Sequence, residues 1–334
     1  VVLIADGAGF AHYSLLIQHL QNRKLLQRFD KTCLVATSRS SGFTKTQRWS
    51  HSSDPAKLLL HNLPLVTESA GSASCASTGK WACRGCIAQT NSKKKQQTLG
   101  QFAKKVGYNV AVACTTDFFD ATPASFVVNN SSRYNRQAIE TDMLRFGLHT
   151  LFSGGKRILE LVEQESTALN KVTHRVGCVH RGGGRFVDGV QRTVKSFGTA
   201  VQTALDGLLV EENPFFLLAE ESCIDLASHM QNKNQMAKEL ESFSYTLKVL
   251  LDFVENPLHQ TTLVVLSDHA TAGAQIVNRQ DEKAAYFKTT HGDHDGYLVP
   301  LFIAGQHAHR VNLPVLLDMP EVHSRVLKPI LQMT

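Results

Sequence analysis

The sequence predicts an α/β fold in which a mostly parallel central sheet carries helices on both faces. Short runs rich in apolar and β-branched residues recur along the 334 residues, and amphipathic stretches with helical spacing separate them. Strands that alternate with helices pair in parallel, because each helix crosses the sheet between two strands. With 43% hydrophobic and 19% charged residues, the chain can bury a core of the size that this fold needs.

Six runs are predicted as strands, because each is short, apolar and bounded by polar or turn-forming residues. In chain order they are Val1–Ala5, Cys33–Ala36, Asn109–Cys114, Phe215–Ala219, Leu263–Leu266 and Val299–Ala304. Five stretches are predicted as helices, because their apolar residues recur every three or four positions. They are Thr98–Lys105, Arg136–Arg145, Lys156–Glu163, Phe197–Glu211 and Gln235–Val254. No apolar run approaches the roughly 20 residues of a bilayer-crossing helix, so we expect no membrane span.

The domain organisation expected is one domain over residues 1–334, because no repeat or low-complexity linker divides the chain. Residues 154–207 are the least regular part and include the glycine-rich segment Arg181–Arg185. We therefore expect them to form a region inserted into the main fold.

Charge and cysteine content narrow the classes of function. A net charge of +6 would attract anions, but the one dense basic run, Lys93–Lys95, has no interleaved aromatic residues, so we expect a solvated loop and no specific nucleic-acid partner. Seven cysteines are too few for a disulfide scaffold, and the odd number leaves at least one thiol unpaired. The close pair Cys83 and Cys86 is expected to be buried or singly bridged. The chain begins at Val1 without an apolar leader, so no signal peptide is expected within it.

Acidic and histidine side chains follow four of the predicted strands, where open α/β sheets place their chemistry. They are Asp6, Asp120 with Thr122, Glu220 with Asp225 and His229, and Asp268 with His269. Each alone fits a turn, a helix cap or a surface pair. Together at one sheet edge, the carboxylates would repel one another unless cations neutralised them. Mixed histidine and carboxylate ligands favour Zn²⁺ and an oxygen-only set favours Mg²⁺, so both kinds of site are expected.

The segment from Val66 to Gly79 is dominated by small residues. A helix that begins near Ser69 would direct its amide donors and the positive end of its dipole at an anion, which makes Ser69 a candidate nucleophile. A small-residue helix packed tightly against the sheet explains the same composition, and the segment alone does not decide between them.

Seven motifs in collinear order resemble the metal-dependent alkaline phosphatase family, from Val1 to about His307. They are Leu3–Gly9, Val66–Ala70, Asp120–Ala124, Arg133, Glu220–His229, Ser267–His269 and His294–Pro300. Each motif is weak alone, but their order and the spacing of Glu220, Asp225 and His229 make the resemblance specific. It implies the three-layer fold of that family and hydrolysis of small-molecule phosphate monoesters through a phosphoserine on Ser69.

The resemblance also implies the cofactors, two Zn²⁺ and one Mg²⁺, and their ligands. Asp225, His229 and His294 would hold the first zinc, and Asp6, Asp268 and His269 the second. Asp6 would bridge to the magnesium, which Thr122 and Glu220 would complete, with Asp120 acting through a water. Arg133 would grip two phosphate oxygens with its planar guanidinium, a geometry that lysine cannot offer.

Two departures from the family pattern bear on the site. Glu68 stands where the family usually has Asp, and that carboxylate normally orients the arginine, so the position of Arg133 and the affinity for phosphate are open. His291 and His294 compete for the last position on the first zinc. We prefer His294, because its spacing to Val299 and Pro300 matches the family.

Other functions share parts of this pattern. A phosphodiesterase of the same superfamily would use the same metals, and a non-catalytic phosphate- or metal-binding protein could keep the same scaffold. A sulfatase is not expected, since Ser69 lacks the proline and arginine of the sulfatase motif. The resemblance further implies a periplasmic or secreted location, and a homodimer is compatible with the family.

Overall fold

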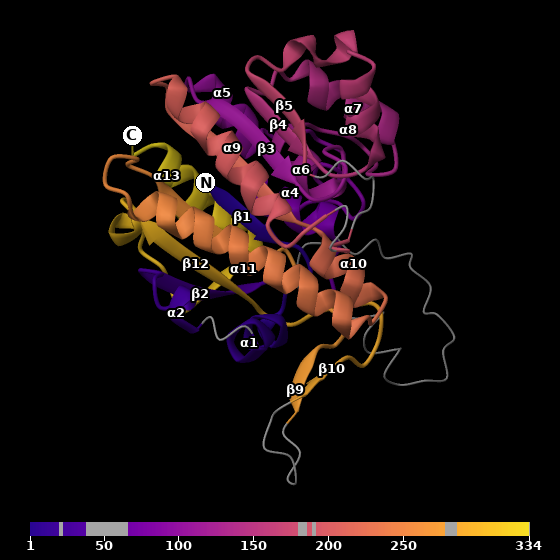
Figure 1. The fold of residues 1–334 in the computed structure, drawn as a ribbon, viewed down its shortest axis with the longest axis vertical. Helices are drawn as coiled ribbons and strands as arrows, with labels where there is room; N and C mark the ends of the chain where they lie inside the picture. The colour runs from indigo at the N-terminus through magenta and orange to yellow at the C-terminus, as the bar shows by residue number, and fades with distance from the viewer. Residues whose placement is uncertain (20–22, 38–65, 180–185, 189–191, 278–285, 334) are drawn as a thin grey trace.

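The computed structural model describes residues 1–334 except 20–22, 38–65, 180–185, 189–191, 278–285 and 334, and it has the predicted α/β architecture (Figure 1). Within the described residues, nine strands form one sheet. They are β1 (Val2–Ala5), β2 (Lys31–Ala36), β3 (Asn109–Cys114), β4 (Thr150–Ser153), β5 (Arg175–Cys178), β6 (Phe215–Glu221), β7 (Thr262–Leu266), β12 (Val299–Gly305) and β13 (Leu316–Asp318). Their order in space is β13-β2-β12-β7-β1-β6-β3-β4-β5. Strand β12 is antiparallel to both neighbours and every other pairing in this sheet is parallel.

Helices cover both faces of the sheet, which gives three layers. One face carries α1 (Phe10–His19), α2 (Arg23–Leu26), α9 (Ser196–Val210), α10 (Cys223–His229) and α11 (Lys233–Glu255), with α9 and α11 crossing in front in Figure 1. The other carries α4 (Ser69–Thr78), α5 (Leu99–Lys105), α6 (Ala121–Val127), α7 (Arg136–Arg145), α8 (Lys156–Glu163), α12 (Met319–Val322) and α13 (Lys328–Leu331). Short helical turns are η1 (Thr167–Lys171), η2 (Ala308–Arg310) and η3 (His323–Leu327).

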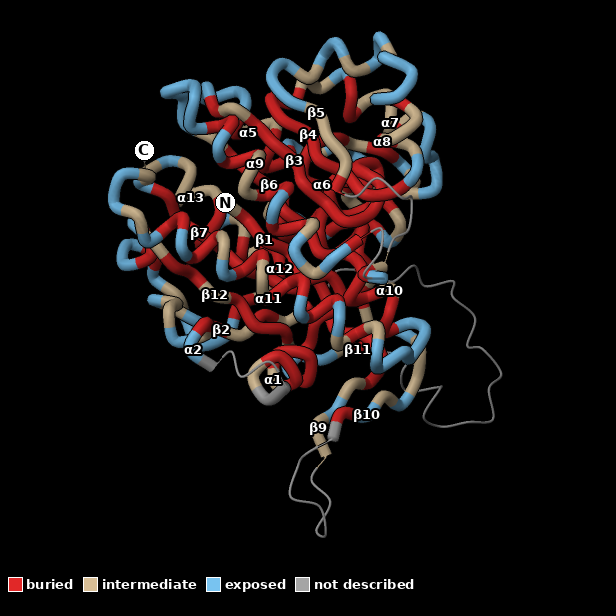
Figure 2. Tube along the Cα trace, in the orientation of Figure 1, coloured by how far each residue is buried: buried red, intermediate tan, exposed pale blue. Residues whose placement is uncertain are grey.

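Strand β1 lies at the centre of the sheet, and its side chains alternate between the two cores. Val2 and Ile4 pack into one core, and Leu3 and Ala5 pack into the other. All four are buried, which is why this strand reads as a continuous apolar run (Figure 2).

The six predicted strands and five predicted helices are present with ends shifted by at most two residues. The sequence interpretation missed β4, β5 and β13, because runs of three or four residues carry little periodicity. Of residues 154–207, the described part forms α8, η1, β5 and most of α9, and β5 extends the sheet by pairing with β4. The segment Arg181–Arg185 lies outside the described residues.

Two small antiparallel pairs lie beyond the sheet. Strand β8 (Ala270–Thr271) pairs with β11 (His294–Asp295), and β9 (Gln275–Val277) pairs with β10 (Tyr286–Lys288) in the hairpin that extends from the body in Figure 1. Among the described residues, no helix combines the length and the apolarity that a membrane crossing requires.

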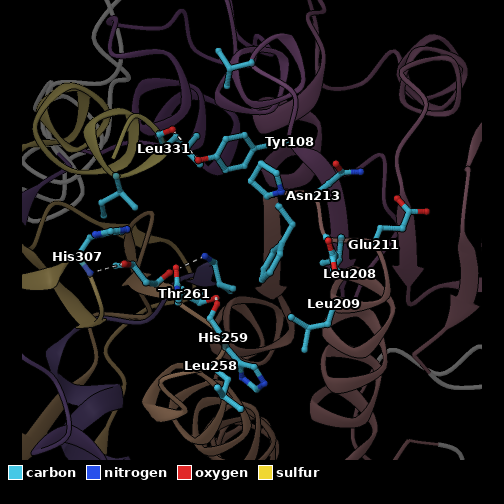
Figure 3. Close-up of a pocket in the computed structure, with 18 residues that line it drawn as sticks. Tyr108, Leu208, Leu209, Glu211, Asn213, Leu258, His259, Thr261, His307 and Leu331 are labelled. Carbon is cyan, nitrogen blue, oxygen red and sulfur yellow. Dashed lines mark hydrogen bonds between the residues drawn. The ribbon is translucent and has the colours of Figure 1, made fainter. Parts of the chain in front are cut away.

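A cavity of about 570 Å³ opens at the amino-terminal edge of the parallel strands (Figure 3). Its lining includes Tyr108 and Pro214, which precede β3 and β6, and Thr261, which precedes β7. The predicted active-site residues follow the opposite ends of these strands, so this cavity is separate from them.

Candidate active site

The carboxyl ends of three adjacent strands bring most of the predicted site together. Asp6 follows β1, Glu220 lies near the end of β6, and Asp268 and His269 follow β7. Strand β1 pairs with both β6 and β7, so these residues meet although 263 positions separate the first from the last. Helix α10 then adds Asp225 and His229 on successive turns.

The first cluster consists of Asp225, His229 and His294, whose candidate ligand atoms all lie within 4.8 Å of one another. His294 reaches it because β11 pairs with β8, directly after His269. The Nε2 atom of His229 lies 3.1 Å from Asp225 Oδ2, and the Nε2 atom of His294 lies 3.8 Å from Asp225 Oδ1. This set of two imidazoles and one carboxylate has the donor chemistry that Zn²⁺ prefers.

The two imidazoles of this cluster face each other so closely that a cation between them would be favourable. The Nδ1 atom of His229 lies 2.6 Å from the Gly292 carbonyl oxygen, and Nδ1 of His294 lies 2.8 Å from that of Thr67. A carbonyl only accepts, so both Nδ1 atoms carry a proton, and a ring whose single proton is on Nδ1 presents a lone pair at Nε2. Those two Nε2 atoms are 3.0 Å apart. A cation between them, either a metal ion or a proton, removes the repulsion.

The second cluster consists of Asp6, Asp268 and His269, all of them buried. The Nε2 atom of His269 lies 3.4 Å from Asp6 Oδ1 and 3.3 Å from Asp268 Oδ2. Both carboxylate oxygens are buried, and neither has a hydrogen-bond partner among the described residues. Buried polar atoms are nearly always satisfied, so these orphaned oxygens fit a bound metal.

The third group has oxygen donors only. Thr122 Oγ1 and Glu220 Oε2 are buried without a hydrogen-bond partner in the described part of the chain, and both atoms fit a hard cation such as Mg²⁺. Asp120 precedes α6, where its Oδ1 accepts a hydrogen bond of 2.8 Å from Arg136 Nη1. Arg136 also pairs with Asp117 at 2.8 Å, and it is a supporting residue that the sequence interpretation did not identify.

Ser69 begins α4, a helix whose ten residues are all buried. Its Oγ lies 3.2 Å from His269 Nε2, so the predicted nucleophile lies directly beside the second cluster. Ser72, one turn along, donates a hydrogen bond of 2.5 Å to the Asp268 carbonyl. The small side chains of α4 therefore let the helix pack against the end of β7, which agrees with the packing interpretation of this segment. The role of Ser69 as the nucleophile stays a prediction.

Arg133 and Glu68 form an ion pair at the start of α4. Arg133 Nη1 lies 2.7 Å from Glu68 Oε2, so the glutamate at this position reaches the arginine. The same carboxylate accepts hydrogen bonds from the amides of Ala70 and Gly71, which caps the helix. Burial is the largest single effect and lowers the pKa of Arg133, but the charge and hydrogen bond of Glu68, together with the charges of Asp6 and Asp120, outweigh it and leave that pKa raised.

The turn between Cys83 and Cys86 contacts both Glu68 and Arg133. Cys83 and Cys86 form a disulfide, as one of the two expectations for this pair. Inside the turn, the Gly85 amide donates to Glu68 Oε1 at 2.9 Å, and the Gly85 carbonyl accepts from the Arg133 amide at 2.7 Å. The turn thus fixes both partners of the ion pair from one side.

The structure separates the two candidate histidines. His294 lies in the first cluster, whereas His291 Nε2 lies 2.9 Å from Asp295 Oδ1. The sequence interpretation missed Thr271, whose Oγ1 donates to Asp225 Oδ1 at 2.5 Å and lies 3.2 Å from His269 Nδ1. Its position in β8, only two residues after His269, is the signal that could have identified it.

Burial and mutual repulsion raise the pKa values of several carboxylates in the site. Burial, and next the charge of Asp225, raises the pKa of Asp268 to about 7, and burial raises the pKa of Glu220 to about 8. Burial also raises the pKa of Asp6, together with the charges of Asp268 and Asp225. The hydrogen bond to Asp225 raises the pKa of His229 to about 9. Without metal ions, the folded chain therefore holds protons that metals would displace.

These shifts predict how metal binding depends on pH. Asp268, Glu220 and His229 have folded pKa values raised to about 7, 8 and 9. The stability that their protons give the metal-free fold is therefore lost as the pH rises from about 4, where unfolded carboxylates titrate, to about 9. Metal-loaded chain does not depend on those protons. We expect the difference in Tm between metal-loaded and EDTA-treated chain to widen by several degrees over this range in thermal melts. Parallel Tm curves would contradict the clustering of these groups around metals.

Comparison with known proteins shows which family the sequence matches. The family model described as alkaline phosphatase matches residues 1–157 and 151–310. Alkaline phosphatase 3 of Bacillus subtilis is 27% identical over 299 residues, which cover 83% of this chain. The chain spans 62% of the length of that curated relative.

Solved structures agree with the fold. Alkaline phosphatase from the Antarctic bacterium TAB5 superposes with a TM-score of 0.76 at 19% identity, covering 98% of this chain and 96% of that one. A cold-active alkaline phosphatase from the psychrophile Shewanella sp. superposes with a TM-score of 0.77 at 22% identity, covering 98% of each chain. At these identities the likeness concerns the fold.

Proposed function

The chain belongs to the alkaline phosphatase family, and from that premise we propose that it hydrolyses phosphate monoesters through a phosphoserine on Ser69. The observation that carries the proposal is the position of Ser69 Oγ, 3.2 Å from His269 Nε2, next to a buried cluster of carboxylates and imidazoles. The histidine beside Ser69 is His269, which belongs to a cluster of metal-type ligands. Its role here would be to bind a metal ion, and not to act as the general base of a serine hydrolase.

The proposed cofactors are two Zn²⁺ and one Mg²⁺. The residues fit them: Asp225, His229 and His294 would hold one zinc, Asp6, Asp268 and His269 the other, and Asp6, Thr122 and Glu220 the magnesium, with Asp120 nearby. When bound, such ions lower the pKa of hydroxyl and water nucleophiles and neutralise charge on a phosphoryl group.

The chain's own residues perform the remaining tasks. Ser69 Oγ would attack the phosphorus atom and form the phosphoester while the alcohol departs, and water would later cleave that ester and release inorganic phosphate. Arg133 would bind two phosphate oxygens, held in place by Glu68. Gly292 and Thr67 orient the two imidazoles through their carbonyls, and Thr271 orients Asp225.

A metal-depletion assay tests this function. The chain is incubated with Zn²⁺ and Mg²⁺, and hydrolysis of p-nitrophenyl phosphate is followed at alkaline pH before and after EDTA, then after return of each metal. We expect EDTA to abolish hydrolysis and the combined metals to restore it. Hydrolysis that survives chelation would contradict the proposal. Faster hydrolysis of bis(p-nitrophenyl) phosphate would favour the phosphodiesterase alternative, and phosphate binding without turnover would favour the non-catalytic one.

Glu68→Gln tests whether the pair of Glu68 and Arg133 contributes to phosphate affinity. The substitution removes the charge that pairs with Arg133, so we expect KM for p-nitrophenyl phosphate and the inhibition constant of inorganic phosphate to rise about tenfold, with a smaller fall in kcat. Steady-state kinetics measure both. The control is Glu140→Gln, which breaks a comparable pair with Arg157 between α7 and α8 and should leave KM unchanged. Equal effects of the two substitutions would remove the special role of Glu68.

We also propose that the protein works in the periplasm or outside the cell. The disulfide between Cys83 and Cys86 supports this location, because disulfides persist in oxidising compartments. Alkylation of thiols in freshly isolated protein, before and after reduction, should find both cysteines protected until reduction. Immediate alkylation of both would contradict it. The homodimer stays a prediction.

A further inference from the structure

A second group of metal-binding side chains lies at the opposite edge of the sheet from Ser69. His149 directly precedes β4, His174 directly precedes β5, and Glu211 follows α9 shortly before β6. All three strands are parallel, so these residues share the amino-terminal edge, and Glu211 also lines the cavity in Figure 3. None of them takes part in the proposed phosphatase chemistry.

The three side chains converge closely. One ring nitrogen of each histidine and one carboxylate oxygen of Glu211 lie within 4.8 Å of one another. The two imidazole rings are stacked, with centroids 4.7 Å apart and planes inclined by 11°. A backbone hydrogen bond of 2.9 Å from the His174 amide to the His149 carbonyl holds the two residues side by side.

His149 provides an independent sign of a ligand. Its side chain is only 4% exposed, and its Nε2 atom is buried with no hydrogen bond to any residue that the structure describes, although it lies 3.3 Å from Glu211 Oε2. Its other nitrogen, Nδ1, lies 2.9 Å from Thr150 Oγ1. A buried ring nitrogen that faces a carboxylate without a hydrogen bond is unusual, and a metal ion between the two would satisfy both.

Two further features suit a metal. Asn109 Nδ2 donates to Glu211 Oε2 at 2.9 Å, which is the kind of outer support that orients a ligating carboxylate. The donor set is that of Asp225, His229 and His294, two imidazoles and one carboxylate.

We propose that His149, His174 and Glu211 bind a third Zn²⁺, remote from the catalytic centre. Zinc suits this mixture of nitrogen and oxygen donors, whereas Mg²⁺ requires oxygen ligands. The ion would tie the starts of β4 and β5 to the segment that leads into β6. Its role is structural, because it joins the edge strand β5 to the sheet.

Equilibrium dialysis against buffered micromolar Zn²⁺, followed by elemental analysis, tests the site in the full chain. His174→Ala and Glu211→Gln alter exposed residues, so neither should prevent folding. We expect each variant to bind one zinc fewer per chain than the original protein, with unchanged turnover of p-nitrophenyl phosphate. His309→Ala, at another exposed histidine, is the matched control and should keep the full zinc content.

A second measurement separates this site from the catalytic one. Zn²⁺ should raise the Tm of the original chain more than that of either variant, whatever the phosphatase activity proves to be. Equal zinc content in the variants and the original would overturn the proposal. Loss of zinc together with loss of turnover would also overturn it, because the missing ion would then be catalytic.

Discussion

Ser69→Ala is expected to reduce turnover of p-nitrophenyl phosphate on the order of 10³-fold or more while leaving the fold intact. The substitution removes the hydroxyl that lies beside His269 Nε2 in the second cluster. The Thr271 hydroxyl lies at the other ring nitrogen, Nδ1, and donates to Asp225, so we do not expect it to replace Ser69. Alanine suits the start of a buried helix of small residues, so α4 should persist. Steady-state assays measure the loss, and thermal melts check the fold.

A covalent readout makes this test specific. Acid quenching during turnover should trap one phosphoryl group on the original chain, located at Ser69 by mass spectrometry, and none on the variant. The exposed hydroxyl of Ser324 provides the control, since Ser324→Ala should change neither turnover nor labelling. Normal turnover in Ser69→Ala would end the phosphoserine mechanism, even if the metals proved essential.

His294→Ala should have the second large effect, a loss of turnover on the order of 10²-fold or more with one zinc ion lost per chain. The substitution removes one of the two facing Nε2 atoms of the first cluster and leaves Asp225 and His229 without a third partner. Elemental analysis and steady-state kinetics measure the two losses.

His291→Ala is the matched control, because this histidine lies only three positions away and pairs with Asp295 instead. We expect it to keep its zinc and to lose no more than about threefold in turnover. If His291→Ala loses zinc and His294→Ala does not, the assignment of the two histidines is reversed. Equal zinc content in both variants would remove the first cluster from the metal-binding proposal.

Much of the fold could be predicted from the sequence, because its central strands are buried on both faces. Leu263–Leu266 and Asn109–Cys114 have almost no polar residues, so their length and composition identify them. Strand β5 could not be found this way. Its four residues are partly exposed and take their conformation from pairing with β4, which is a tertiary effect.

The position of the site was predictable to a similar extent. Charged side chains that directly follow strands, such as Asp6 and Asp268, can be predicted from their position, and the structure brings them together. The residues that orient these side chains cannot be predicted in this way. Thr271, Gly292 and Thr67 act through a hydroxyl or a backbone carbonyl, and almost any residue can offer a carbonyl. Their contribution depends on how the chain folds back near β8, which local sequence does not encode.

The turn closed by Cys83 and Cys86 has a consequence for how the protein responds to its surroundings. One glycine in that turn contacts both Glu68 and Arg133, so we expect a sulfur–sulfur bond outside the site to influence how firmly the proposed site holds phosphate. Exposure to a thiol reductant should therefore weaken phosphate inhibition while every metal ligand stays in place. The same polypeptide would then retain phosphate tightly in oxidising surroundings and release it readily in reducing ones, without any change at its metals.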